Sequence, residues 1–226
     1  MKPINSNTDA LLITDPQNDF LSESGVVWDV VGESVKENNT IANLDSLFSA
    51  AKQAGMKTFV SPHYYYPKDH DWEFKGTLEQ VMHDTGMFDR KGSLDLDGFK
   101  DSGADWLEQY KPYIEDGETI VCSPHKVYGP ETNDLILQLR KHGINRVILA
   151  GMSANLCVEA HMRELIEQGF YVTVVNDATA GGKVPELGDG YESALVNFRF
   201  IANESVTTED VVNAIASGEE TIRQAA

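Results

Sequence analysis

The stretch ILAGMSANLCVEAH, residues 148–161, contains the pattern that decides the fold. An apolar run ends at Gly151, small polar residues follow, and the apolar spacing then becomes helical around Cys157. A buried strand that passes through glycine into a helix is typical of an α/β protein. A cysteine at the start of such a helix serves either as packing or as a nucleophile, and the rest of the sequence has to distinguish these roles.

The strand-and-helix pattern recurs along the chain. Apolar, β-branched runs occur at residues 10–14, 57–61, 119–123, 146–151 and 171–175. Because these runs are continuously apolar rather than alternating, they predict strands covered on both faces, as in a parallel sheet. Amphipathic helical segments, each followed by glycine, lie between most of them, at residues 34–54, 131–142 and 154–168. The alternation predicts an α/β fold with a doubly wound, mostly parallel sheet.

The C-terminal part of the chain and the long segment in its middle complete the predicted arrangement of elements. Further helices are expected at about 187–200 and from Glu209, with a short segment near Val206. All of residues 1–226 are expected to form one domain, since this length supplies one good core. The exception to the regular alternation is residues 63–116, which are too long for a plain connector. We expect this excursion to form a lid, a pocket wall or a subunit contact.

Composition restricts the classes of partner. The formal net charge is −18, so the chain repels phosphate backbones and anionic membrane surfaces, and we expect neither nucleic acid nor membrane as a partner. The N-terminal residues contain no apolar run of signal-peptide or membrane-span length. With two cysteines, Cys122 and Cys157, a disulfide scaffold is not indicated. These features favour a reduced, cytoplasmic setting.

Reactive side chains follow three of the predicted strands. Asp15 comes directly after the first strand, Lys126 just past the third, and Cys157 after the fourth. Ligands of open α/β sheets bind beyond the carboxyl ends of the strands, so these three side chains are expected to meet there. Cys122, by contrast, lies inside an apolar strand and is expected to be inert.

The presence of an aspartate, a lysine and a cysteine together indicates a hydrolytic mechanism. A helix N-terminus and the Lys126 ammonium would both favour the thiolate form of Cys157. Asp15 could accept the thiol proton and return it to a leaving amine. Backbone N–H groups at the start of the helix could hold the oxyanion. Attack of cysteine on an amide carbonyl, followed by hydrolysis of the acyl-enzyme, is the reaction that such a set performs.

These residues lie in blocks that resemble the isochorismatase-like cysteine hydrolases, a superfamily that includes nicotinamidases, carbamoylsarcosine amidases and isochorismatases. The matching blocks are LLITDPQNDF, SPHKVYGPETNDLILQLR, GMSANLCVEAHMREL and YVTVVNDATAG, in family order. The resemblance implies a three-layer α/β/α fold and a triad of Asp15, Lys126 and Cys157. It also implies a cis peptide between Met152 and Ser153 that aims the Ser153 and Cys157 amides at the substrate oxygen.

The chain departs from the nicotinamidase pattern at the metal site of those enzymes. Nicotinamidases carry Asp-x-His and further histidines after the second strand, whereas this chain has Ser61-Pro62-His63. His63 and His70 alone make a poor site, because zinc normally takes three or four protein ligands. We therefore predict no bound metal and no cofactor.

Several further residues are candidates for the substrate pocket. Phe20 follows the Asp15 block, and His63, Tyr65 and Trp72 belong to the aromatic segment HYYYPKDHDWEF, which could close over a substrate or pack against the core or another subunit. His161 lies one helical turn after Cys157, where it could pair with the thiol or hydrogen-bond locally. His125, beside Lys126, is interpreted as structural.

The resulting hypothesis is a metal-independent cysteine hydrolase that cleaves an amide-like C–N bond of a small molecule. Two alternatives remain open. In a vinyl ether hydrolase of the isochorismatase type, Asp15 would act as the acid and Cys157 would be a bystander. In a non-catalytic member of the superfamily, the fold would persist without the reaction. The resemblance also implies a homodimer or homotetramer.

Overall fold

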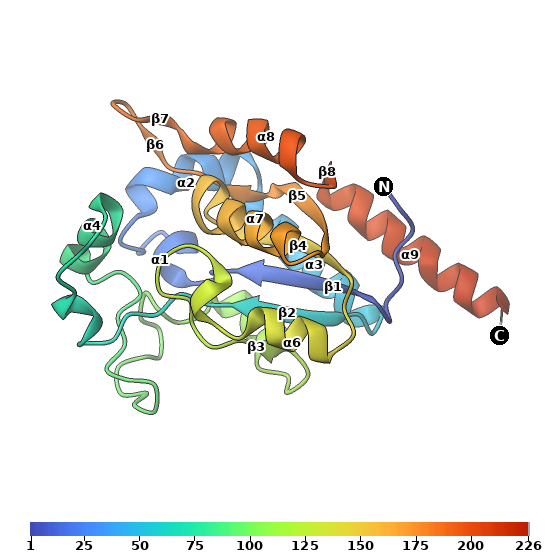
Figure 1. The fold of residues 1–226 in the computed structure, drawn as a ribbon, viewed down its shortest axis with the longest axis horizontal. Coiled ribbons are helices and arrows are strands. Elements are labelled where there is room, and N and C mark those ends of the chain that lie inside the picture. Colours follow the sequence, from blue (N-terminus) through green and yellow to red (C-terminus); the bar gives the residue numbers. More distant parts are fainter. Residues whose placement is uncertain (226) are drawn as a thin grey trace.

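A computed structural model of the chain describes residues 1–225, so that Ala226 of the expected domain lies outside the described residues. Its centre is a six-stranded parallel sheet with the strand order β3-β2-β1-β4-β5-β8 (Figure 1). The strands are β1 (Asp9–Thr14), β2 (Lys57–Ser61), β3 (Ile120–Val121), β4 (Arg146–Met152), β5 (Tyr171–Ala180) and β8 (Glu204–Val206). The prediction of an α/β fold with a mostly parallel sheet is confirmed.

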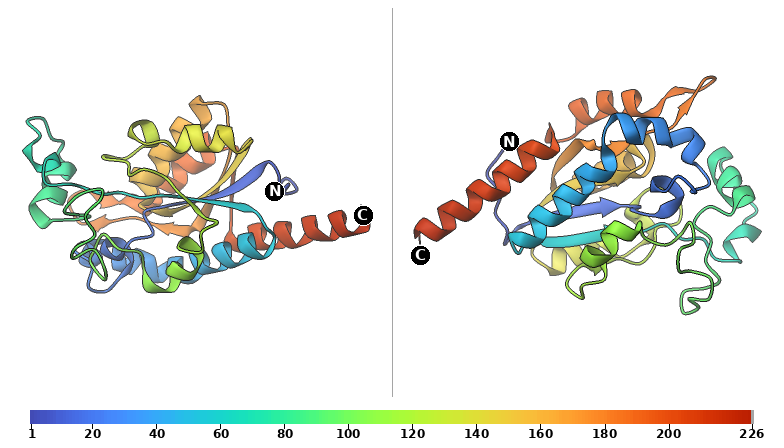
Figure 2. Two further views of the ribbon diagram at one scale, coloured as in Figure 1. Left: turned by 90° about the horizontal axis from the view of Figure 1, so that it is seen from below. Right: turned by 180° about the vertical axis from the view of Figure 1, so that it is seen from behind.

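Helices cover both faces of the sheet and produce three layers (Figure 2, left). One face packs against α2 (Trp28–Glu37), α3 (Thr40–Gln53), α5 (Lys111–Ile114) and α9 (Thr208–Ala225), and the other against α6 (Leu135–Lys141), α7 (Glu159–Glu167) and α8 (Gly190–Ile201). The first strand shows why its sequence is continuously apolar. Leu11 and Ile13 belong to the core on the first face, and Ala10 and Leu12 to the core on the second.

Two of the helical segments expected from the sequence have a different form in the structure. The segment at 34–54 contains two helices rather than one, because Asn39 adopts a left-handed conformation with φ of 51° between α2 and α3. Asparagine tolerates this region better than other non-glycine residues, so the chain can turn here without a glycine. The segment at 154–168 begins with a π-helical turn over Ala154–Val158, which leads into α7.

The strand order creates a crevice at the carboxyl ends of β1 and β4. The chain builds β1, β2 and β3 outward in one direction, and then returns to place β4 on the other side of β1. Such a switch point is where open α/β sheets bind ligands. Gly151 permits the close approach of the two strands there, since its φ is 116° and a Cβ atom would lie 2.1 Å from the Thr14 carbonyl oxygen.

The excursion at 63–116 lies beyond this end of the sheet (Figure 2, right). It contains a 3₁₀ turn at Asp69–Asp71, α4 (Thr77–Thr85), a second 3₁₀ turn at Glu108–Tyr110, and α5. A short β6–β7 hairpin (Lys183–Val184 and Gly188–Asp189) precedes α8, and the four-residue α1 (Asn18–Leu21) follows β1. Within the described residues, none of the helices combines the length and the apolar composition needed to span a bilayer.

Candidate active site

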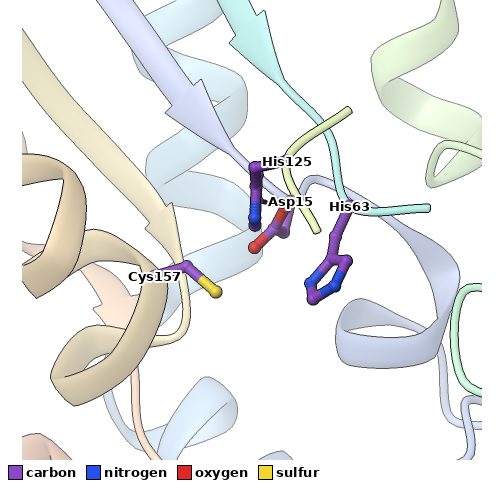
Figure 3. A group of neighbouring side chains, drawn as sticks. All are labelled: Asp15, His63, His125 and Cys157. Atoms are coloured by element: carbon purple, nitrogen blue, oxygen red, sulfur yellow. Dashed lines mark hydrogen bonds and ion pairs between the residues drawn. The ribbon is translucent and has the colours of Figure 1, made fainter. Parts of the chain in front are cut away.

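Four buried side chains converge at the switch point, one from the end of each of four neighbouring strands (Figure 3). Asp15 follows β1, His63 follows β2, His125 follows β3, and Cys157 lies in the turn after β4. One N, O or S atom from each lies within 4.8 Å of the corresponding atom of the other three. We call these four residues the polar cluster.

Asp15 is the hub of the polar cluster. Its side chain is fully buried, and its backbone has a φ of 46°. His125 Nε2–H donates to Asp15 Oδ1 at 2.8 Å, and the Cys157 sulfur lies within 4.8 Å of an oxygen of the same carboxylate. The expected meeting of Asp15 and Cys157 is therefore present in the structure. A buried carboxylate beside a thiol is placed to act as a general base.

Cys157 is held as a neutral thiol. Burial, the neighbouring Asp15 charge and the hydrogen bond to Asp15 all raise the pKa of the Cys157 thiol well above its ordinary value. The backbone N–H groups of Ser153 and Cys157 lower this pKa by hydrogen-bonding to the sulfur, but the raising effects are larger. The expectation of a standing thiolate is therefore corrected, because the charge nearest to the sulfur is negative.

Lys126 does not supply the positive charge that was expected of it. Its Nζ donates to the Tyr64 carbonyl oxygen at 2.9 Å and to Asp69 Oδ2 at 2.5 Å, and it lies 3.8 Å from the centre of the Tyr66 ring. In the structure His125, rather than Lys126, contacts Asp15. Successive residues of an extended chain point to opposite sides, so His125 faces inward and Lys126 outward.

His63 completes the polar cluster in its neutral form. Burial lowers the pKa of His63 well below its ordinary value, and repulsion from His125 adds to this effect. Its Nε2–H donates to the carbonyl oxygen of Lys126 at 3.1 Å. Gln17 fixes the His63 backbone, since it accepts from the His63 N–H at 3.0 Å and donates to the His63 carbonyl at 2.9 Å.

The peptide between Met152 and Ser153 is cis, as the family resemblance implies. Both residues are buried, and the Ser153 side chain donates to the Ala180 carbonyl at 3.3 Å. The backbone N–H groups of Ser153 and Cys157 lie near the sulfur and lower the pKa of the Cys157 thiol. Two convergent N–H donors beside a nucleophile have the arrangement of an oxyanion hole.

A cavity of about 100 Å³ opens beside Cys157. Its lining consists mostly of apolar side chains from α2, from the excursion and from the loops after β3 and β4. The lining residues are Phe20, Val27, Val30, Val31, His63, Leu78, Met82, Met87, Val127, Tyr128, Ser153, Leu156, Cys157 and Gly182. Phe20 and His63 are thus where the sequence predicted them, in the pocket. We call the apolar members of this lining the apolar wall.

Three other predicted pocket residues lie behind this cavity rather than in it. Tyr65 is fully buried and packs edge-on against His83, with ring centres 4.4 Å apart. Trp72 packs against Tyr65, and neither ring lines the cavity. His161 is also fully buried, and its Nδ1–H donates to the Cys157 carbonyl oxygen at 2.7 Å rather than to the thiol. None of these three residues therefore lines the cavity beside Cys157.

The role of His161 is to support the polar cluster from behind. Its Nε2 bonds to Ser61 Oγ at 2.8 Å, and Asn133 Nδ2–H donates to the same oxygen at 2.9 Å. Burial lowers the pKa of His161 to about 3, so the ring is neutral at pH 7. The chain Asn133–Ser61–His161 thus connects the loop after β3 with the turn that carries Cys157.

Sequence reasoning missed His125 and most of the apolar wall. The alternation of side chains along the extended third strand would place His125 and Lys126 on opposite sides of the chain. It does not show which of the two faces inward. The pairing of His63 with His125, which continues the β2–β3 ladder as a parallel bridge, decides it. The wall residues of α2 and α4 carry no sequence signal beyond being apolar, and apolar residues usually indicate core.

The polar cluster also has the composition of a metal site. One carboxylate, two imidazoles and one thiol are ligands that zinc accepts, and the four ligand atoms lie close together. Hydrogen bonds already engage Asp15 with His125, and His63 with the Lys126 carbonyl. The sequence-based expectation that the reaction needs no metal stays a prediction.

Comparisons with known proteins agree with this geometry. A family model described as the isochorismatase domain matches residues 9–210. The chain is 25% identical over 226 residues to the ureidoacrylate amidohydrolase RutB of Variovorax paradoxus, an alignment covering 94% of this chain and 83% of that protein. It is 29% identical to nicotinamidase 3 of Arabidopsis thaliana over 203 residues, with coverages of 87% and 83%.

The fold has close counterparts among solved structures. A cysteine hydrolase from Pseudomonas syringae pv. phaseolicola 1448A superposes with a TM-score of 0.78 at 20% sequence identity, covering 96% of this chain and 97% of that chain. The match of the family model extends over most of the sequence and includes all four members of the polar cluster. The chain therefore belongs to the isochorismatase family and is a hydrolase of that family.

Proposed function

We propose that this protein is a cysteine amidohydrolase that cleaves the C–N bond of a small amide through a thioester on Cys157. The observation that carries the proposal is the convergence of the buried Cys157 thiol and the buried Asp15 carboxylate, whose sulfur and oxygen atoms lie within 4.8 Å of each other at the ends of β4 and β1. The relatives named above as a ureidoacrylate amidohydrolase and a nicotinamidase support C–N bond cleavage as the reaction type.

The first half of the reaction begins from the neutral thiol. As Sγ attacks the carbonyl carbon of the amide, the S–H proton passes to the Asp15 carboxylate. Because the pKa of the thiol is raised, proton transfer accompanies the attack rather than preceding it. The new S–C bond produces a tetrahedral intermediate, whose oxyanion the N–H groups of Ser153 and Cys157 stabilise.

The second half regenerates the enzyme. Protonated Asp15 donates its proton to the leaving nitrogen as the C–N bond breaks, which releases ammonia or an amine and leaves the thioester. Asp15 then accepts a proton from a water molecule that attacks the thioester, and returns it to the sulfur as the acid product leaves. His125 is a positioning residue here, since its hydrogen bond fixes the orientation of Oδ1 and leaves the carboxylate facing the sulfur.

The proposal is tested with a panel of primary amides and N-carbamoyl compounds, by measuring ammonia release and the intact mass of acid-quenched enzyme. We expect turnover together with a mass increase equal to the acyl group, located on Cys157. Cys157→Ala should abolish both signals. Cys122→Ala is the matched control and should retain them, because burial raises the pKa of Cys122 to about 12 and the cavity lining does not include this residue. Turnover that persists in Cys157→Ala would contradict the proposal.

A further inference from the structure

We infer that the acyl group of the substrate is small, uncharged and apolar, such as a short branched hydrocarbon chain. This inference rests on the proposed function and names the substrate class of the same site. It comes from three observations: the chemistry of the apolar wall, the state of the cations near the cavity, and the size of the cavity.

The cavity beside Cys157 offers no charge to a substrate. Among the described residues that line it, valine, leucine, methionine and phenylalanine side chains predominate. None of these described residues is a lysine, an arginine, an aspartate or a glutamate. A carboxylate placed in this cavity would lose its hydration without gaining a counter-ion, which is strongly unfavourable.

The two lysines that adjoin lining residues in the sequence are already paired with acidic side chains. Lys126, next to the lining residue Val127, binds Asp69. Lys183, next to the lining residue Gly182, lies 2.9 Å from Glu33 and 2.6 Å from Glu37. A negatively charged substrate would have to displace one of these carboxylates, and the net charge of −18 opposes its approach.

The size of the cavity limits the acyl group. Its volume of about 100 Å³ is below the ~150 Å³ of an apolar cavity that admits benzene. A branched chain of four or five carbon atoms fits this space and can contact the valines of α2 and the methionines Met82 and Met87.

The test compares isovaleramide with succinamate, which has a carboxylate in place of the branched methyl groups, and with nicotinamide. We expect kcat/KM for isovaleramide to exceed that for succinamate by roughly 100-fold or more. Isovaleramide should also protect Cys157 from iodoacetamide, followed by peptide mass, at concentrations where succinamate does not. Protection measures occupancy of the cavity, so it reports on the inference even where turnover is slow.

A charged variant sharpens the test. Leu78→Arg introduces a cation into the apolar wall from α4, and should lower kcat/KM for isovaleramide while raising it for succinamate. Val81→Arg is the matched control on the same helix, because Val81 is 48% exposed and does not line the cavity. This control should keep the preference of the native enzyme.

The outcomes separate the inference from the proposed function. Acylation of Cys157 by succinamate or nicotinamide in preference to isovaleramide would overturn the inference and leave the cysteine mechanism intact. Equal protection by succinamate and isovaleramide, or protection by neither, would also overturn the inference. Turnover of isovaleramide by Cys157→Ala would contradict the proposed function, whatever the substrate preference.

Discussion

The polar cluster and the apolar wall face the same cavity but have different origins in the chain. Asp15, His63, His125 and Cys157 each follow a strand of the parallel sheet, and the strand order brings them together. The apolar wall comes mainly from α2, from the excursion that contains α4 and from single loop residues. The comparison suggests that the sheet fixes the reaction, whereas segments outside the sheet set the substrate.

The polar cluster and the apolar wall also differ in how firmly their side chains are held in place. Each member of the polar cluster is at most 3% exposed, and hydrogen bonds hold Asp15, His63 and His125. The wall residues Val27 and Leu78 are only partly buried against the core, and Val30 is 39% exposed. Changes in the cluster should therefore affect kcat for every substrate, and changes in the wall should affect the choice among substrates.

The largest effect is expected from Asp15→Asn. The variant keeps the shape of the side chain but removes the general base, so kcat should fall by about 10³-fold for all amides. Steady-state ammonia release checks this prediction. A fall limited to one class of amide would place Asp15 with the substrate-selecting residues and break the division between cluster and wall.

A smaller effect is expected from His125, and almost none from its neighbour Lys126. His125→Ala removes the donor to Asp15 and leaves a buried carboxylate less satisfied, so kcat should fall by about 10²-fold. His125→Gln restores an N–H donor and should recover part of the loss without a change in KM. Lys126→Met should leave kcat within about threefold, since its ammonium binds Asp69 instead. The reverse order of effects for these neighbours would support the triad that the sequence predicted.

Truncation in the apolar wall should change specificity rather than the chemical step. Met82→Ala removes part of the wall that faces the acyl chain, so KM for isovaleramide should rise by about 10-fold. Acetamide is too short to reach this position, and its kcat/KM should stay unchanged. Parallel losses for both amides would show that Met82 supports the polar cluster and not the substrate.

The smallest effect is expected from His161, which lies behind the polar cluster, and it concerns the free energy of unfolding. The pKa of His161 is about 3 in the fold and ~6.5 in an unfolded chain, so between these values the unfolded state binds a proton that the native state does not. The free energy of unfolding should therefore decrease as the pH falls below 6.5, by about 1.4 kcal/mol per pH unit from this residue. Urea denaturation at several pH values should show a shallower decrease in His161→Gln than in the native protein. An unchanged slope would mean that His161 titrates alike in both states.

The sequence predicted the sheet well because its signal is local and repeated. Continuous apolar runs followed by glycine-terminated helices define the strands, and the rule for ligand sites in α/β sheets then located Asp15 and Cys157 at one edge. The choice between His125 and Lys126 depends on which side of an extended segment faces inward, and only the pairing with His63 determines this. The expected homo-oligomer stays a prediction.

The excursion and the pocket were less predictable for a physical reason. Tyr65 and Trp72 have the composition of a substrate lid, yet they pack against His83 and the core, because the same apolar surface serves either purpose. Asn39 ended a helix where the apolar spacing continued, since a left-handed residue leaves little trace in the periodicity. Contacts between segments distant in sequence decided each of these cases.

The most direct test of the central claim is the rate of alkylation of Cys157 by iodoacetamide in native enzyme and in Asp15→Asn, measured against pH. If Asp15 is the base beside a neutral thiol, removing its charge lowers the pKa of Cys157. The account predicts that Asp15→Asn is alkylated faster than native enzyme at neutral pH while it hydrolyses amides far more slowly. Slower alkylation of the variant, with the pKa of Cys157 unchanged or raised, would contradict it.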